Sequence, residues 1–317
     1  MPASPRSLCL ILNPRAAGDE QLRAAVHGLR AAGHRIEVRP TWESGQAEQF
    51  AHEITTHHTF DAIVVGGGDG TLNELVNGIM AAAPDRPPAV GVLPYGTAND
   101  FATGIGMPAD DPVAALQLIA TAPSRPIDLG RVNDRWFINA ASVGLNAEIT
   151  ADTPKSLKQL LGGAAYSLNA LTKLTTDAHR PATVTANSPQ PEATNRKPET
   201  NPDLHWQGDM LMLIVANART AGGGHVIAPH AQLDDGELDL TLVANAPAAD
   251  LADVLTQALT TGTPHHPAVI QQRVTSLTVE TEQPVTLNLD GEPTSERRCQ
   301  FQVHPRVLPV LMGPRQA

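Results

Sequence analysis

Short apolar runs alternate with helical patterns through the first 125 residues of this chain. The runs predict strands at residues 7–12, 36–41, 60–65 and 89–93. The patterns after them predict four helices. The first ends near residue 33, the second covers residues 44–58, the third starts at Thr71 and the fourth covers residues 112–121. Strict strand–helix alternation is typical of an open parallel sheet covered on both faces, so we assign this part to the α/β class.

Strand patterns dominate from about residue 126 onwards. They lie at residues 136–141, 182–186, 209–216, 237–243, 274–281 and 285–289, with helical patterns only near 155–175 and 247–260. This predicts a second, mostly antiparallel β-rich domain with a sandwich-like fold. The segment 187–203 is rich in Pro, Asn, Thr and Glu, and we interpret it as a flexible loop inserted in a hairpin.

A glycine-rich loop, GGGDGTLNE at residues 66–74, follows the third apolar run. Leu72, Leu75 and Val76 then recur at helical spacing, so the loop joins a strand to a helix N-terminus. Glycines let the backbone approach a ligand, and free N–H groups with the helix dipole favour an anion, most simply a phosphate. The loop fits neither the Walker A pattern nor the dinucleotide pattern GxGxxG.

The same loop has an interpretation that needs no ligand. Thr71 with Glu74 fits a capping box, in which the two side chains satisfy the helix N-terminus by themselves. Asp69 and Asn73, however, add a carboxylate and an amide, and a plain turn has no need of both. We therefore favour phosphate binding.

Several polar loops are expected at one edge of the predicted sheet, because the carboxyl ends of parallel strands meet there. These are the loops at residues 13–18, 66–71 and 94–100, and Thr41 ends the second strand at the same edge. Ligands of such sheets bind beyond this edge, so we place the candidate site there.

Two Asp-Gly turns in the second domain carry further candidate chemistry. The turn at 234–236 precedes alternating apolar residues and is explained by a hairpin alone, although carboxylate and carbonyl oxygens could also converge on a hard cation. The segment 289–293, LDGEP, is either a hairpin with two solvated carboxylates or the carrier of a general base. Spacing alone favours the plain turn at 234–236, and it does not by itself establish a general base at 289–293.

Composition narrows the classes of partner. The chain has 317 residues, 41% of them hydrophobic, and a net charge of −11, which disfavours nucleic acid and strong docking on anionic lipid. No apolar run approaches the ~20 residues that span a bilayer, and we see no signal peptide, so we expect a cytoplasmic protein. Cys9 and Cys299 lie in strand-like contexts and are expected to be buried free thiols, with one disulfide as the alternative that the sequence leaves open.

Four motifs in this order together resemble the bacterial diacylglycerol-kinase-like lipid kinases of the YegS type. They are the glycine loop at 66–74, LPYGTAND at 93–100, LDDGEL at 233–238 and LDGE at 289–292. The likeness covers nearly the whole chain, and the insert at 187–203 is its main departure. The resemblance implies an ATP-binding catalytic domain over 1–125, a β-rich lipid-acceptor domain over 126–298, an active cleft between them, and a final segment, 299–317, that returns to the first domain.

The resemblance also implies roles for individual residues. Glu292 would be the catalytic base that takes the proton from a lipid hydroxyl, and Asp69 with Asp100 would position Mg²⁺, directly or through water. A structural cation, Mg²⁺ or Ca²⁺, would bind at Gln232, Asp235 and Glu237, with backbone carbonyls as the ligands at the first and last. The implied contacts to ATP are Thr41, Gly67, Gly68, Asp69, Gly70, Thr71, Leu72, Asn73 and Thr97.

The function that the resemblance implies is transfer of the γ-phosphoryl group of ATP to a membrane lipid with a free hydroxyl, within phospholipid biosynthesis. Membrane contact would be peripheral and transient, and a homodimer is compatible with the sequence. Two alternatives stay open. One is a kinase for a soluble acceptor, since NAD kinases have a related GGDG loop. The other is a non-catalytic nucleotide or lipid sensor. The sequence does not identify the lipid.

Overall fold

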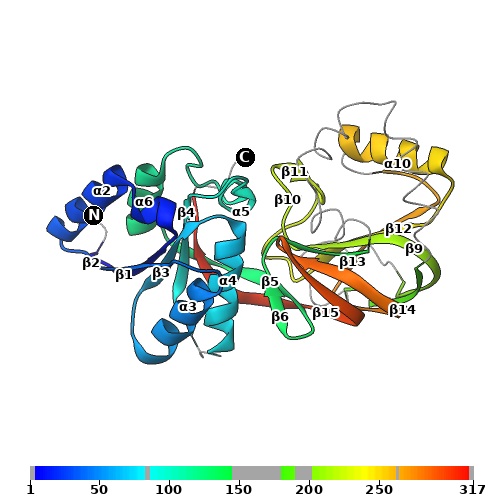
Figure 1. Ribbon diagram of the computed structural model, residues 1–317, viewed down its shortest axis with the longest axis horizontal. Coiled ribbons are helices and arrows are strands. Elements are labelled where there is room, and N and C mark those ends of the chain that lie inside the picture. The colour runs from blue at the N-terminus through cyan, green and yellow to red at the C-terminus, as the bar shows by residue number, and fades with distance from the viewer. Residues whose placement is uncertain (1–3, 83–85, 145–179, 190–201, 262–263, 314–317) are drawn as a thin grey trace. The chain divides into compact units, whose positions relative to one another are not determined.

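The chain divides into two compact units in the computed structural model, which describes residues 4–82, 86–144, 180–189, 202–261 and 264–313 (Figure 1). Unit 1 consists of residues 1–129, 220–225 and 305–317. Unit 2 consists of residues 130–219 and 226–304. The chain therefore passes from one unit to the other four times.

Unit 1 is built on a parallel sheet with the strand order β4-β3-β1-β2 (Figure 1). Every residue of β3 is buried, which explains the continuous apolar run in its sequence. The far end of β15 (Glu292–Leu311) adds to this sheet, where Val310 pairs in parallel with Val90. The strand bounds are β1 (Ser7–Leu12), β2 (Arg35–Pro40), β3 (Ala62–Gly67) and β4 (Ala89–Pro94).

Helices cover both faces of this sheet, as the alternating pattern predicted. Helices α3 and α4 pack together on one face, and α2 and α6 lie on the other (Figure 1). The α/β assignment of the N-terminal part is therefore confirmed. The helix bounds are α1 (Pro14–Ala17), α2 (Glu20–Ala31), α3 (Gln46–His57), α4 (Asp69–Ala81), α5 (Asp100–Gly104) and α6 (Pro112–Thr121).

Unit 2 is β-rich and antiparallel, with the strand order β13-β12-β9-β7-β14-β15. Strand β8 pairs with both β14 and β9, and β5 pairs with β6. One helix, α10 (Ala248–Thr261), matches the predicted helical segment at 247–260. The strand bounds are β5 (Ser124–Val132), β6 (Arg135–Phe137), β7 (Ala140–Gly144), β8 (Pro181–Asn187), β9 (Leu204–Ala216), β12 (Leu238–Ala244), β13 (Val269–Val274) and β14 (Ser276–Leu289). A two-stranded ribbon of β10 (Thr220–Ala221) and β11 (His225–Val226), of which residues 220–225 belong to unit 1, completes the element order.

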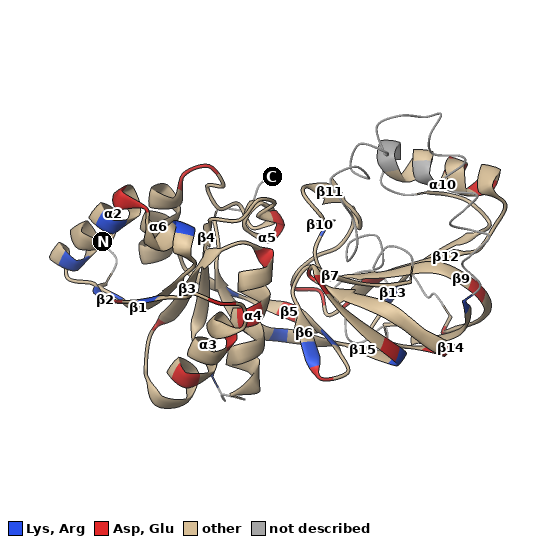
Figure 2. Ribbon diagram, in the orientation of Figure 1, with Lys and Arg blue, Asp and Glu red and all other residues tan. Residues whose placement is uncertain are grey.

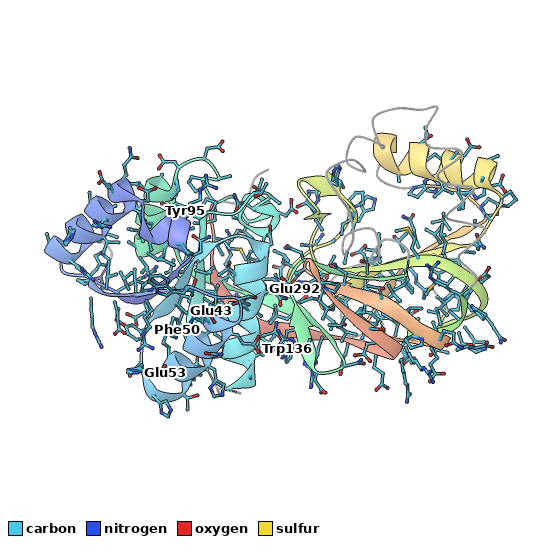
Figure 3. All side chains as sticks on the ribbon, in the orientation of Figure 1. Glu43, Phe50, Glu53, Tyr95, Trp136 and Glu292 are labelled. Carbon is cyan, nitrogen blue, oxygen red and sulfur yellow. The ribbon has the colours of Figure 1, made fainter. Side chains whose placement is uncertain are left out.

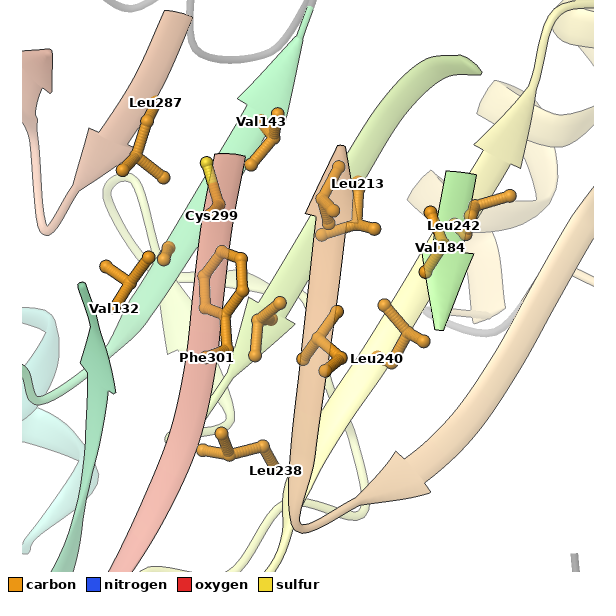
Figure 4. Close-up of a cluster of buried hydrophobic side chains, with 14 of the residues drawn as sticks. Val132, Val143, Val184, Leu213, Leu238, Leu240, Leu242, Leu287, Cys299 and Phe301 are labelled. Atoms are coloured by element: carbon orange, nitrogen blue, oxygen red, sulfur yellow. The ribbon is translucent and has the colours of Figure 1, made fainter. Parts of the chain in front are cut away.

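The core of unit 2 is formed by the apolar residues that alternate along its strands. Val184, Leu213, Leu240, Cys299 and Phe301 belong to one buried cluster (Figure 4). The ring of Phe301 meets that of Phe137 edge-on, with 6.3 Å between the ring centroids. This confirms the predicted β-rich second domain.

The structure departs from the predicted elements where polar residues and prolines interrupt strands. The predicted strands at 274–281 and 285–289 are one strand, β14, because a register shift between Glu280 and Val285 absorbs the intervening residues. Strands β5, β13 and β15 were not predicted. In β15, Pro293, Pro305 and Pro309 interrupt the strand pattern. The predicted helix at 155–175 and residues 190–201 of the insert lie outside the described residues.

Candidate functional site

The glycine loop ends β3 and starts α4, whose N-terminus carries no side-chain cap. Gly68 is the N-cap residue, and α4 begins at Asp69, two residues before the predicted start at Thr71. The capping-box interpretation is therefore wrong, because Thr71 lies inside the first turn. An N-terminus without a side-chain cap, at the positive end of the helix dipole, is a place where an anion is favoured.

Glu74 has a different role from the predicted cap. Its carboxylate accepts hydrogen bonds from the Ser44 hydroxyl at 3.0 Å and from the Ala47 N–H at 3.2 Å. These contacts fasten the loop after β2 to the helix that begins at the glycine loop.

The glycine loop is in backbone contact with the loop that follows β4. A Cβ atom on Gly96 would lie 2.3 Å from the Cα of Gly68, and a Cβ on Gly68 would lie 3.0 Å from the Cα of Gly96. A Cβ on Gly67 would lie 2.6 Å from the side chain of Thr71. Only glycine fits at this approach, so the two loops present backbone rather than side chains there.

Asp69 and Asp100 are brought together by hydrogen bonds to the backbone. The carboxylate of Asp69 accepts from the N–H groups of Asp100 and Phe101, each at 3.1 Å. The buried carboxylate of Asp100 accepts from the N–H groups of Gly223 at 2.8 Å and Gly224 at 2.5 Å. Both carboxylates therefore organise the loops of unit 1, whatever further role they have.

A second link at this edge joins the loops after β1 and β4. The hydroxyl of Tyr95 donates to Asp19 at 2.7 Å, and Asp19 also caps α2 (Tyr95 is labelled in Figure 3). Burial, and then the bond to Asp19, raise the pKa of Tyr95, while the same bond and the capping N–H groups lower the pKa of Asp19. The hydroxyl therefore stays protonated as a donor.

The other predicted ATP contacts differ in accessibility. Thr41 is buried at the end of β2, and its N–H donates to the Leu12 carbonyl at 2.8 Å. Asn73 is buried in α4, where its side-chain oxygen accepts from Asn77 at 3.0 Å. Leu72 packs in the core and its N–H is bonded to Gly68, whereas Thr97 is exposed. Each remains a prediction as an ATP contact.

The Asp-Gly-Glu segment forms the turn between β14 and β15 in unit 2. Asp290 and Gly291 have φ angles of 48° and 105°, and Glu292 pairs with Leu289 across the turn. The interpretation with two solvated carboxylates is wrong for Asp290, which accepts from the N–H groups of Ile138, Asn139 and Ala140 at 2.8–3.0 Å.

Glu292 is the carboxylate of this turn that remains exposed (Figure 3). No hydrogen bond or ion pair of its side chain is found within the described part of the chain. The turn therefore fixes the backbone of Glu292 through Asp290 and leaves its carboxylate accessible for chemistry.

The turn at 234–236 presents a mixed set of groups. The N–H of Glu237 donates to Asp235 at 3.2 Å, and Gln232 is exposed. The buried carboxylate of Glu237 forms an ion pair with the Arg273 guanidinium, with 3.0 Å between the two groups. The geometry of this contact does not meet the criteria for a hydrogen bond. Side chains alone do not form a cation site here, since no group of three His, Cys, Asp or Glu residues suited to a metal occurs within the described ranges.

Sequence reasoning did not predict the contacts made by four features of this region, namely Glu74, Tyr95, Gly96 and the glycine run 222–224. The one local signal was the glycine run itself, whose three residues all have positive φ angles.

Lysine and arginine are spread over separate elements of the described chain (Figure 2). No helix among the described residues is long and apolar enough to cross a membrane.

Comparison with known proteins identifies the family. Residues 7–132 match the diacylglycerol kinase catalytic domain, and residues 139–312 match the YegS C-terminal NAD kinase beta sandwich-like domain. A Pseudomonas aeruginosa (strain UCBPP-PA14) protein named a probable lipid kinase YegS-like is 39% identical over 301 residues, covering 95% of this chain and 92% of that protein. A Cronobacter sakazakii protein of the same name is 36% identical over 306 residues, covering 96% and 95%.

A solved structure supports the same assignment at the level of the fold. It is a crystal structure of a Bacillus anthracis protein assigned as a diacylglycerol kinase, and it matches with a TM-score of 0.73 at 23% identity over 97% of each chain. The present chain belongs to the YegS-like family of lipid kinases, which is related to the diacylglycerol kinases. Its enzyme class is therefore phosphotransferase.

Proposed function

We propose that this protein transfers the γ-phosphoryl group of ATP to the hydroxyl of a membrane lipid. The observation that carries the proposal is the N-terminus of α4, which has no side-chain cap and lies where two loops meet through glycine residues. The chain also belongs to a family of lipid kinases. Backbone N–H groups at such a helix end neutralise phosphate charge without a side chain that would block its approach.

The residues of unit 1 fit a triphosphate at this edge of the sheet. Gly67, Gly68 and Gly70 would present backbone groups, and Thr71 and Thr97 would add hydroxyls. Thr41, the residue after β2, would lie at the same edge of the sheet. A site organised in advance by backbone contacts needs little rearrangement when the charged ligand binds.

Mg²⁺ fits the two carboxylates of this region, because the ion is usually held by one or two protein carboxylates together with phosphates and water. Asp69 and Asp100 each have two carboxylate oxygens, and an ionised carboxylate offers about four acceptor sites in all. When bound, the ion would supply charge neutralisation at the transferred phosphoryl group.

Glu292 would act as the general base that takes the proton of the lipid hydroxyl. Its accessibility supports this role, and the anchored turn holds its backbone in place. A positioned general base contributes roughly 10²–10⁴-fold to a rate.

The turn at 232–237 would hold a structural cation, Mg²⁺ or Ca²⁺, through Asp235 and the backbone carbonyls of Gln232 and Glu237. The measurement is the melting temperature with and without CaCl₂ or MgCl₂, in the wild type and in Asp235→Asn. We expect the ion to raise the melting temperature of the wild type only. An equal rise in both proteins would remove the cation from this turn.

The experiment that tests the function is phosphate transfer from γ-labelled ATP with Mg²⁺ into a total bacterial lipid extract, resolved by chromatography. We expect a labelled lipid, and we expect Glu292→Gln to lower its formation by roughly 10²–10⁴-fold with ATP binding near normal. Glu282→Gln is the matched control, because Glu282 is another exposed glutamate of unit 2, and its rate should match the wild type.

Other outcomes separate the alternatives. A labelled soluble product from NAD or a sugar phosphate, with no labelled lipid, would replace the lipid acceptor with a soluble one. ATP binding without any product would indicate a sensor. An unchanged rate in Glu292→Gln would take the base role from Glu292.

A further inference from the structure

Trp42 is the most exposed large apolar side chain among the described residues. It is 84% exposed, against 45% for Val226 and 37% for Val38. A tryptophan usually buries most of its ring area, so an indole left in solvent next to a candidate ligand site is informative.

The backbone that carries Trp42 is well ordered by hydrogen bonds. The N–H of Trp42 donates to the side-chain oxygen of Gln46 at 2.6 Å, and the N–H of Glu43 donates to the same oxygen at 3.3 Å. On the preceding side, the N–H of Thr41 donates to the Leu12 carbonyl at 2.8 Å. The exposed indole therefore projects from a fixed loop.

This loop is tied to the glycine loop through α4. Ser44 and Ala47 donate to Glu74, which lies in the early part of the helix that starts at Asp69. The strand β1 lies between β2 and β3, and the N–H after it, that of Asn13, donates to the Gly66 carbonyl at 2.8 Å. Trp42 and the candidate phosphate site therefore lie at the same edge of one sheet, within unit 1.

We propose that the indole of Trp42 stacks on the purine base of the nucleotide whose phosphates occupy the glycine loop. The inference rests on the proposed function, because it requires ATP at that loop. In doubly wound sheets the sugar and base extend from the phosphate loop past the ends of neighbouring strands, and β2 ends at Pro40, two residues before Trp42. A flat, exposed aromatic ring offers a base its π-face and contributes affinity by stacking.

The surroundings of Trp42 favour a nucleobase over a lipid surface. Glu43 and Ser44, which follow it, are exposed and polar (Glu43 is labelled in Figure 3). The chain carries a net charge of −11, and a tryptophan that inserts into a membrane interface commonly has cationic and apolar neighbours instead.

The test measures the dissociation constants of ATP and of inorganic tripolyphosphate, which has no base, for the full chain and its variants. We expect Trp42→Ala to weaken ATP binding about 10-fold and to leave tripolyphosphate binding unchanged. Trp42→Phe should keep most of the affinity, because phenylalanine retains a stacking face. ATP should quench the fluorescence of the wild type and of Trp136→Phe, and the quenching should be lost in Trp42→Phe.

Three results would overturn the inference. Equal affinity for ATP in Trp42→Ala and the wild type would remove the stacking role while leaving the proposed function intact. Loss of sedimentation with phosphatidylglycerol vesicles in Trp42→Ala, with ATP affinity unchanged, would reassign Trp42 to the membrane. A wild type that binds neither ATP nor tripolyphosphate would overturn the proposed function and the stacking together.

Discussion

The absence of a side chain is the decisive property of Gly68 and Gly96. A Cβ atom on Gly96 would come within 2.3 Å of the Cα of Gly68 and 2.7 Å of the side-chain oxygen of Asn99. The first of these atoms is backbone and cannot rotate away. A single methyl group would therefore separate the two loops that form the candidate ATP site.

We predict that Gly96→Ala lowers ATP affinity at least 10-fold, because separating the loops would displace the N–H groups proposed to bind the phosphates. The matched control is Gly28→Ala in α2, where an added Cβ meets nothing within 4 Å. That control should bind ATP normally and gain roughly 0.5–1 kcal/mol of stability. Isothermal titration with ATP checks both variants, and normal affinity in Gly96→Ala would contradict the close contact.

At the scale of elements, the β14–β15 hairpin illustrates how one carboxylate positions another. Asp290 accepts three backbone N–H groups, two just before β7 and one from its first residue, so the turn that follows Asp290 is anchored. Its φ angle of 48° is one that Asp and Asn tolerate better than most residues. The general base proposed at Glu292 is therefore positioned by an aspartate whose carboxylate is bonded to backbone N–H groups.

We predict that Asp290→Ala destabilises the protein by about 1–3 kcal/mol, because it leaves the N–H groups of Ile138, Asn139 and Ala140 without their acceptor. Asp290→Asn should lose less, since it keeps one acceptor oxygen and the left-handed preference. Asp134→Ala is the control, because Asp134 is an aspartate of a turn in the same unit whose side chain is 98% exposed. Urea unfolding measures all three, and equal midpoints would show that the hydrogen bonds of Asp290 contribute nothing.

The helices and strands of unit 1 were the most predictable elements. Buried parallel strands are apolar throughout, so β1 and β4 were found within one residue of their bounds. The start of α4 was missed by two residues because Thr71 and Glu74 imitate a cap. Local sequence could not show that Glu74 is engaged by Ser44 and Ala47, which belong to another element.

At the scale of the whole molecule, each compact unit contains one buried cysteine. Cys9 lies in β1 of unit 1, and Cys299 lies in β15 of unit 2. Both are free thiols, as the sequence predicted. Burial raises the pKa of each thiol to about 12, so almost no reactive thiolate exists in the folded protein near neutral pH. Each cysteine therefore reports the opening of its own unit.

We predict that a thiol reagent at neutral pH labels neither cysteine in the native protein and labels both in denaturant. Adding ATP should slow the labelling of Cys9 in dilute urea more than that of Cys299, because the proposed nucleotide site lies in unit 1. Peptide mass spectrometry distinguishes the two positions. Equal slowing of both would mean that the units open together, and rapid labelling without denaturant would contradict their burial.

The sequence by itself determined the α/β and β-rich halves, the glycine loop and the family, because periodicity and ordered motifs are local properties of the chain. Only the tertiary structure decided which polar residues are structural. It engaged Asp290, Glu74, Gly223 and Gly224 in hydrogen bonds with distant segments, and it left Glu292 and Trp42 exposed. The physical reason is that a carboxylate becomes structural when distant segments of the chain donate hydrogen bonds to it. Spacing along the chain does not show which carboxylates have such donors.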